Sequence, residues 1–180
     1  GQVSNAGAGL EAAQFTLQEM QAAVDEAHRF GRKVAVHAVG LKSIEVSVAA
    51  GVDCIEHGNF LTEARAARRA ECGIFLVPTL LPYRVLADPP AELVLPDDVR
   101  RKSQVAWEKS LEAVRLALAA GVAIGAGTDS GGPCIAHNSV AREIALLIEA
   151  GLPAMQAVQS ATRINAQILG LDDAGTLQAG

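Results

Sequence analysis

The feature that most constrains this chain is a repeated pattern in which a helical stretch is followed by a glycine and then by a short apolar run ending in polar residues. The apolar runs are centred on Val34, Cys54, Leu76 and Ile124. A glycine after a helix adopts a left-handed cap without steric cost, and runs this short suit buried strands. The pattern therefore predicts consecutive αβ units whose four strands form a parallel sheet.

The sequence also marks where helices begin. Thr16, followed three residues later by Glu19, has the spacing of a capping box, in which each side chain bonds the other residue's backbone N–H. Thr62 and Asp97 occupy expected N-cap positions, and Pro153 opens a late helix.

A long helix is predicted from about residue 97 to residue 120, because apolar side chains recur there at helical spacing. Its predicted core stripe consists of Trp107, Leu111, Val114 and Leu118. The preceding segment, Thr79–Pro96, is predicted to be a long loop that serves as a lid or a pocket wall. A solvated surface excursion fits that segment equally well.

A parallel sheet with helical connections is either doubly wound or closed as a (βα)8 barrel. A full barrel takes roughly 250 residues, whereas this chain has 180. We therefore predict an α/β fold of the TIM-like barrel type, present as half a barrel in one partial domain over residues 1–180. The unpaired strand edges and uncovered apolar face of such a half favour truncation or pairing with another half, so a homo-oligomer is expected.

Charge and cysteine content exclude several classes of partner. The net charge is −5 and the basic residues are scattered, so no nucleic-acid partner is expected. Three cysteines at irregular spacing form no disulfide framework, which favours a reducing, cytoplasmic location. The longest nearly charge-free stretch, residues 116–128, is too short to span a bilayer, so no membrane partner is expected either.

Polar residues that can bind metal stand where the predicted strands end, which is where parallel α/β folds place their ligands. These residues are His37, His57, Thr79 and Asp129. Adjacent strands lie about 4.8 Å apart, so imidazoles carried by two such strands can converge on one divalent cation. Asp129 reaches the same point from a glycine-rich turn. The set predicts a Zn²⁺ site with His37, His57 and Asp129 as ligands.

Such a site predicts hydrolytic chemistry, because Zn²⁺ lowers the pKa of bound water from 15.7 to about 7. Asp129 is the predicted catalytic acid and base that carries a proton from this water to the leaving group. Simpler interpretations stay open for each residue alone. Either histidine suits a hydrogen-bonded core position, and Asp129 suits an Asx turn before a helix.

Three further residues are candidates for substrate binding. His137 follows the Asp129 loop, whereas Tyr83 and Arg84 lie beyond the third predicted strand and offer donors to a substrate carboxylate. A solvated loop is the alternative for each of them. Glu56 alternates to the opposite side of its strand from His57, so packing or a buried hydrogen bond is expected for it.

Taken together, these motifs resemble the C-terminal part of the metal-dependent amidohydrolase superfamily, in its prolidase-like and imidazolonepropionase-like branch. The resemblance extends into the tail around Ala161–Thr162 and Gly175–Leu177. The segments that carry it are Val36-His37-Ala38, Ile55-Glu56-His57-Gly58, Val77-Pro78-Thr79 and Gly127-Thr128-Asp129-Ser130-Gly131.

The resemblance implies a (βα)8 barrel that holds one or two divalent metals, with this chain supplying strands five to eight and their helices. His37 and His57 then match the ligands on strands five and six, and Asp129 matches the aspartate of strand eight. The family's His-x-His pair and bridging lysine have no counterpart in this sequence. The upstream barrel half and the small β-sandwich domain are therefore expected to be missing from this chain.

The expected function is that of a metal-dependent hydrolase that cleaves an amide or peptide C–N bond. The resemblance implies an Xaa-Pro dipeptidase or a related carboxypeptidase with a small, dipeptide-like substrate. One alternative is a catalytically silent partial barrel that acts as a binding or assembly module. A phosphate-binding barrel enzyme without metal is another, although only Gly131-Gly132 supports it.

Overall fold

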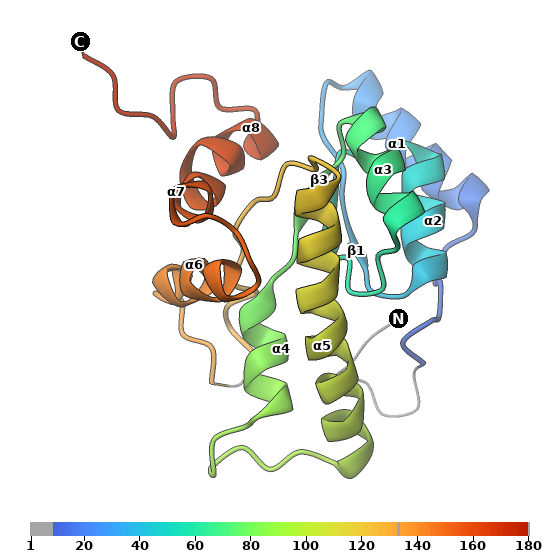
Figure 1. The fold of residues 1–180 in the computed structure, drawn as a ribbon. Coiled ribbons are helices and arrows are strands. Elements are labelled where there is room, and N and C mark those ends of the chain that lie inside the picture. Colours follow the sequence, from blue (N-terminus) through green and yellow to red (C-terminus); the bar gives the residue numbers. More distant parts are fainter. Residues whose placement is uncertain (1–8, 133, 180) are drawn as a thin grey trace.

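The structure, a computed structural model, describes residues 9–132 and 134–179. Three short strands form one parallel sheet in the order β1-β2-β3, with helices packed against it (Figure 1). In chain order, the elements are α1 (Leu17–Arg29), β1 (Ala35–Ala38), α2 (Leu41–Ala50), β2 (Cys54–His57), α3 (Glu63–Cys72), β3 (Phe75–Val77), α4 (Leu80–Ala87), α5 (Asp97–Ala119), α6 (Val140–Glu149), α7 (Ala154–Gln159), the π-helix η1 (Ser160–Ile164) and α8 (Asn165–Leu169).

The α/β prediction is confirmed, with strands and helices alternating from α1 to β3. The helix ends follow the predicted glycine chemistry, since Gly51 and Gly73 cap α2 and α3 with left-handed backbones at φ 82° and 68°. The capping box at the start of α1 is also confirmed. Thr16 and Glu19 exchange both backbone–side-chain hydrogen bonds, at 2.8 and 3.3 Å.

The predicted fourth strand, here named the bridge strand (residues 122–128), is reduced to one bridge between Leu76 and Ile124. Two backbone hydrogen bonds make this bridge: Leu76 N–H to Ala123 at 3.1 Å and Gly125 N–H to Leu76 at 2.8 Å. The ladder stops there because the next N–H group, that of Ala126, turns away to the carbonyl of Ser160. The prediction of a full strand here was therefore wrong, although its place beside β3 was right.

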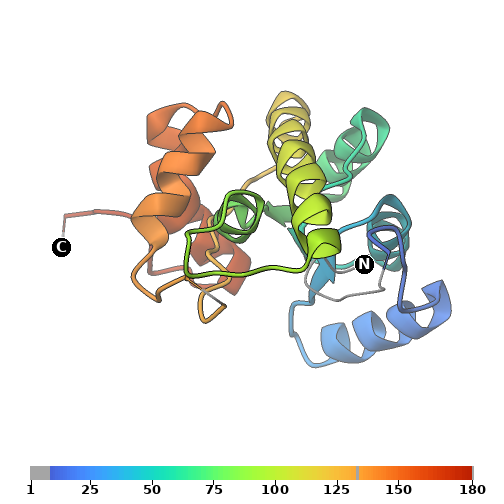
Figure 2. The ribbon, with the colours of Figure 1, turned by 90° about the horizontal axis from the view of Figure 1, so that it is seen from below.

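The two faces of the sheet differ in their surroundings. Ala38, Ile55 and Leu76 point to one face and are fully buried in the main core. Seen from below, α1, α2, α3 and α5 follow one another in an arc outside the strands (Figure 2). Ala35 and His37, on the other face of β1, are exposed. The helices therefore cover one side of the sheet and leave the face that carries His37 open.

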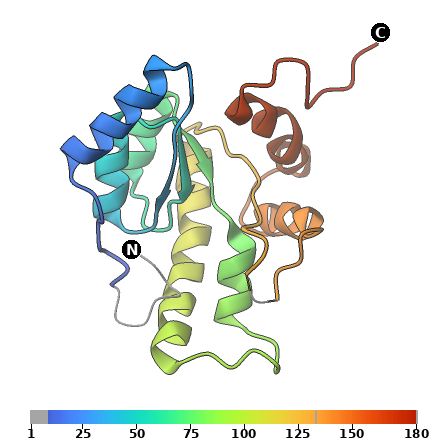
Figure 3. The same ribbon diagram turned by 180° about the vertical axis from the view of Figure 1, so that it is seen from behind.

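The segment predicted as a long loop begins instead with a helix, α4, which runs alongside α5 (Figure 3). Pro82 lies in the first turn of α4, where the missing N–H breaks no helical hydrogen bond. The proline-rich composition therefore indicated a loop where a helix forms. Only the remainder, residues 88–96, connects α4 to α5 without regular structure beyond turns.

Helix α5 has the predicted length, but it begins at Asp97 with Pro96 as its N-cap, so the predicted cap at Asp97 was one residue late. Of the predicted core stripe, Val114 is fully buried, whereas Trp107, Leu111 and Leu118 are half-buried. The most buried face carries small side chains instead, which let neighbouring helices approach closely. These small residues are Ser103, Ala106, Ser110, Ala113 and Ala117.

Two other helix starts agree with the predicted positions. Thr62 is the N-cap of α3, although its side chain makes no capping hydrogen bond, and Pro153 directly precedes α7. Within the described part of the chain, no helix has both the length and the apolar composition needed to cross a membrane.

Candidate functional site

The rings of His37 and His57 meet at the open face of the sheet. His37 comes from β1 and pairs in register with Glu56 on β2. His57 ends β2, and its ring lies edge to face with His37 at a centroid distance of 4.5 Å. Strand alternation alone would turn His57 to the covered side, opposite Glu56. The left-handed backbone of His57, at φ 73°, accompanies its return towards His37.

Left-handed backbone recurs at the ends of three successive strand segments. His57 is the last residue of β2, Thr79 follows β3, and Asp129 follows the bridge strand, with φ values of 73°, 46° and 46°. Apart from Cys134, these are the described non-glycine residues with positive φ. Such backbone costs on the order of 1–3 kcal/mol per residue, and it clusters at active sites. Thr79 is the least expected of the three, because a β-branched residue rarely adopts this conformation.

A short hydrogen bond joins two of these strand ends. Nδ1 of His57 lies 2.6 Å from the hydroxyl oxygen of Thr79. The Thr79 hydroxyl donates its own proton to the carbonyl of Pro78 at 2.8 Å. The hydroxyl oxygen must therefore accept the proton of His57 Nδ1–H. This assignment fixes the ring as the tautomer whose Nε2 carries a bare lone pair, which is the form that ligates a metal.

Burial keeps the His57 ring neutral. Desolvation, with a smaller contribution from His37, lowers the pKa of His57 to about 3. A neutral imidazole is required of a metal ligand, and this ring has that state throughout the physiological range.

Tyr83, a predicted substrate-binding residue, packs against His57. Its ring lies 5.8 Å from the imidazole in an edge-to-face arrangement, and the side chain is buried. Burial raises the pKa of the Tyr83 phenol, and the charge of Asp129 adds to the same direction. The structure therefore places Tyr83 beside the histidine pair, in the wall of the site.

Asp129 is exposed at the end of the bridge strand. Its charge also raises the pKa of Glu56, after the larger effect of burial, which places both carboxylates at the same end of the sheet. Even so, no three His, Cys, Asp or Glu side chains converge closely enough to hold a metal ion among residues 9–132 and 134–179. The two imidazoles meet, and the predicted third ligand stays apart from them.

One side chain, that of Asn165, adds to the backbone hydrogen bonds that hold the bridge strand before Asp129. Asn165, at the start of α8, accepts the N–H of Ala126 at 3.1 Å and donates to the carbonyl of Ala126 at 2.8 Å. Space for this clamp depends on Gly125, where an added Cβ would lie 2.7 Å from the Asn165 oxygen. Asn165 therefore replaces the missing sheet partner three residues before Asp129.

Two predicted substrate-binding residues make local contacts. Arg84 pairs with Asp88 at 2.9 Å, and its guanidinium lies over the ring of Trp107 at 5.9 Å. His137 is exposed, and its ring lies beside Gly131 in the loop that follows Asp129. None of these contacts involves the histidine pair, so a role for either residue in binding stays a prediction.

A mainly apolar cavity of about 430 Å³ opens between α1 and β1, and it reaches His37. Phe15 and Met20 from the α1 side and Val46 from α2 line it with this histidine. The cavity therefore lies at the β1 edge of the sheet and reaches one of the two imidazoles, that of His37.

Sequence reasoning missed one buried residue next to the site. The two carboxylate oxygens of Glu143, in α6, accept the N–H groups of Leu80 and Leu81 at 2.7 and 2.8 Å. The signal was available, because Glu143 stands four residues before Leu147 on the apolar face of the helix, and both side chains are fully buried. Thr79 was recognised as a strand-end residue, but its bond to His57 was not predicted.

The side chains of His37, His57 and Asp129 are suitable ligands for a divalent metal, although they make up only part of a full set of ligands. Zn²⁺ binds neutral imidazole and carboxylate, and the chain offers two converging imidazoles and one carboxylate at a neighbouring strand end. The tautomer of His57 leaves its Nε2 available for such an ion. The described residues therefore fit part of a metal site.

This chain is similar to known proteins in sequence and in fold. An uncharacterised protein of Mycobacterium tuberculosis is 35% identical over 150 residues, which cover 79% of this chain and 38% of that protein. The ochratoxinase of Aspergillus niger is 30% identical over 153 residues, or 83% of this chain and 30% of the enzyme. The crystal structure of an Xaa-Pro dipeptidase with bound methionine is 34% identical, with a TM-score of 0.86, over 94% of this chain and 42% of that one.

The chain thus spans less than half the length of these relatives. The model of the amidohydrolase family nevertheless matches all of residues 1–180. The prediction of family membership is confirmed: this chain belongs to the amidohydrolase family and resembles its prolidase-like members.

Proposed function

We propose that this chain supplies strands five to eight of a (βα)8 barrel whose complete form is a metal-dependent hydrolase of amide or peptide C–N bonds. The observation that carries the proposal is the convergence of His37 and His57, with the second ring held as the neutral Nδ1–H tautomer. A histidine serving only the core would need neither this tautomer nor a second imidazole in edge-to-face contact with its ring.

His37 and His57 are the residues that would hold the ion, with Asp129 as the third ligand. Zn²⁺ is the expected ion, and one or two ions are expected in the complete protein. A bound Zn²⁺ supplies hydroxide near neutral pH, because it lowers the pKa of its water to about 7.

Asp129 is the proposed acid and base. Its carboxylate accepts the proton that the attacking water loses and then donates this proton to the leaving amine nitrogen as the C–N bond breaks. Its exposed position at the end of the bridge strand suits a group that meets both water and substrate.

The proposed substrate is a small, dipeptide-like molecule. The Xaa-Pro dipeptidase that this chain resembles was crystallised with methionine in its active site, and methionine is the size of one half of a dipeptide. The ochratoxinase of Aspergillus niger is also similar to this chain. Arg84, Tyr83 and His137 are the proposed substrate-binding residues. Arg84 would bind a substrate carboxylate, which requires it to give up its exposed pair with Asp88.

The remaining ligands are proposed to come from chain upstream of this segment. An upstream half would also pair the free edge of β1 and cover the open face that carries His37. We propose that the assembled protein is a homo-oligomer, since exposed apolar surface favours self-association. We propose a cytoplasmic location because the three cysteines form no disulfide framework.

The test uses the full-length protein and a panel of Xaa-Pro and N-acyl amino acid substrates. We expect near-stoichiometric divalent metal in the purified protein, and hydrolysis that is lost on chelation and restored by Zn²⁺. In Asp129→Asn, turnover should fall by about 10²-fold or more while the fold is retained. Asp172→Asn, which changes an exposed carboxylate in the tail, is the matched control. Unchanged activity after complete metal removal would overturn the proposal, and absence of both metal and hydrolysis would favour a silent assembly module.

A further inference from the structure

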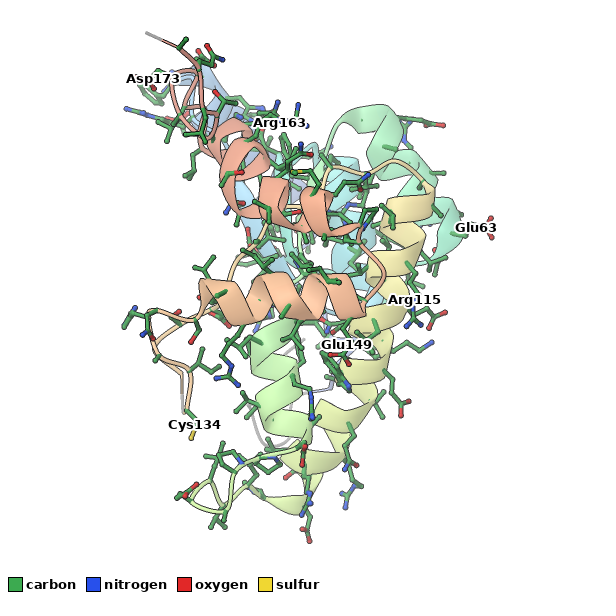
Figure 4. All side chains as sticks on the ribbon, turned by 60° about the vertical axis from the view of Figure 1, so that its left-hand side comes forward. Glu63, Arg115, Cys134, Glu149, Arg163 and Asp173 are labelled. Atoms are coloured by element: carbon green, nitrogen blue, oxygen red, sulfur yellow. The ribbon has the colours of Figure 1, made fainter. Side chains whose placement is uncertain are left out.

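Helix α6 lies across the start of α4 (Figure 4). It carries a buried carboxylate, that of Glu143, which reaches the first residues of α4. Glu143 is fully buried, and each of its two oxygens accepts one of the first N–H groups of α4, from Leu80 and from Leu81. The first N–H groups of a helix have no partner within the helix, and the positive end of the helix dipole favours a negative group there. Glu143 therefore caps α4 from a helix 63 residues away in sequence.

The cap residue itself, Thr79, does not perform this task. A threonine before a helix ordinarily uses its hydroxyl oxygen to accept an N–H from the first turn. Here the Thr79 side chain makes no capping bond to α4. Its hydroxyl instead donates to Pro78 and accepts from His57. The carboxylate from α6 has taken over the capping, which leaves the threonine hydroxyl free for the imidazole.

The backbone of Thr79 also needs external support. At φ 46° and ψ 57° it is left-handed, a conformation that costs a β-branched residue more than most. Strained residues of this kind persist only where the surroundings determine their position strongly. The two hydrogen bonds to Glu143 hold the residues that directly follow Thr79, so they hold the turn in which its hydroxyl faces His57.

We propose that Glu143 is a positioning residue: by capping α4 in place of Thr79, it holds the Thr79 hydroxyl against His57 and so fixes the orientation and tautomer of that imidazole. The function of the imidazole as a ligand rests on the proposed hydrolase activity, whereas the coupling from Glu143 to His57 rests on geometry alone.

The surroundings of Glu143 disfavour an ionised carboxylate, so the placement of this residue needs a physical reason. No Lys or Arg side chain pairs with it in the part of the chain that the structure describes. Burial raises the pKa of Glu143 to about 7, even though the two N–H donors favour its ionised form. A buried acid without a cation is expensive to keep, and the strained turn gives it a specific task.

The test reads the His57 ring directly by ¹⁵N NMR of the histidine nitrogens, in the metal-free full-length protein at pH 8. Glu143→Gln replaces one acceptor oxygen by an NH₂ group, so one of the two N–H bonds is lost. In the wild type, we expect His57 to be the Nδ1–H tautomer, with slow exchange of this proton with water. In Glu143→Gln, we expect His57 to be a mixture of its two tautomers, with proton exchange at least tenfold faster. Glu149→Gln, an exposed position on the same helix, should match the wild type.

A second pair of variants keeps the proposal testable if the amide variant does not fold. Glu143→Asp retains the charge but shortens the reach, and it should shift the His57 ring in the same direction. Thr79→Val removes the hydroxyl and should reproduce the effect, while Glu143→Gln added to Thr79→Val should change the ring no further.

The outcomes separate this proposal from the proposed function. A wild-type His57 signal in folded Glu143→Gln or Glu143→Asp overturns the positioning role, whatever the activity of the protein. A disturbed His57 signal in a protein that proves to have no metal and no hydrolase activity supports the positioning role and overturns the hydrolase.

Discussion

The imidazole of His57 and the hydroxyl of Thr79 are joined across neighbouring strand ends, with Nδ1 and Oγ1 2.6 Å apart. Both residues have left-handed backbones, so two strained positions support one hydrogen bond. The proton arrangement around Thr79 leaves the Nε2 lone pair of His57 bare, and this relationship links the local backbone to the chemistry of the proposed site.

Replacing Thr79 should weaken metal binding without removing a ligand. Thr79→Val loses the oxygen that accepts His57 Nδ1–H, and loss of such a supporting bond typically costs about 10–100-fold in metal affinity. Thr79→Ser keeps the hydroxyl and lacks the β-branched methyl, so it should remain near the wild type. Competition with a chromophoric chelator measures Zn²⁺ affinity in the full-length protein. Equal affinities for the Val and Ser variants would contradict the role of the hydroxyl.

Removing either imidazole should lower the metal content of the full-length protein. His37→Asn and His57→Asn each delete one proposed ligand, whereas His28→Asn changes a histidine that pairs with Asp53 elsewhere in the fold. We expect reduced metal by elemental analysis in the first two variants and wild-type content in the third. Full metal content in His57→Asn would exclude this residue as a ligand.

The Asn165 clamp should be important for the stability of the bridge strand. Asn165→Ala removes both bonds to Ala126, one to its N–H and one to its carbonyl. Because each lost hydrogen bond contributes about 0.5–1.5 kcal/mol, the free energy of unfolding should fall by roughly 1–3 kcal/mol. Chemical denaturation measures this change. Gln167→Ala, an exposed position on α8, is the control, and an equal effect of both variants would refute the clamp.

The stability of the protein should depend on the ionisation of Glu143. Its pKa is raised by burial from 4.5 to about 7, so the folded state binds a proton more tightly than the unfolded state. This contribution to stability is present below pH 4.5 and is lost as the pH rises towards 7, by up to about 3 kcal/mol. Glu143→Gln cannot ionise and should lack this slope.

Denaturation of both proteins from pH 4 to pH 8 checks the sign. The difference in unfolding free energy should shift in favour of Glu143→Gln as the pH rises through this range, with Glu149→Gln following the wild type. A shift in favour of the wild type would mean that the two backbone N–H bonds outweigh burial.

Several features were predictable because their causes are local in sequence. The glycine caps at Gly51 and Gly73 and the capping box at Thr16 depend on residues within one helical turn. The neighbouring positions of His37 and His57 followed from two short apolar runs in consecutive αβ units, since parallel strands end at the same edge. Their assignment as metal ligands stays a prediction.

Other features escaped prediction because their causes are distant. Helix α4 forms where a loop is predicted, since Pro82 suggests a break unless it falls in the first turn. The bridge strand ends early because Ala126 bonds to Ser160 and Asn165, more than 30 residues later. The hydrophobic pattern of a sequence does not show such contacts between distant residues.

By itself, the sequence determined the αβ alternation, the helix caps, the family and the strand ends at which the candidate ligands stand, because each depends on local spacing or on a short motif. Only the tertiary structure decided which way those ligands face. The left-handed turns at His57, Thr79 and Asp129 are unfavourable for an isolated chain. Contacts from α6 and α8, far along the sequence, hold the segments beside Thr79 and Asp129, and the Thr79 hydroxyl in turn bonds the His57 ring.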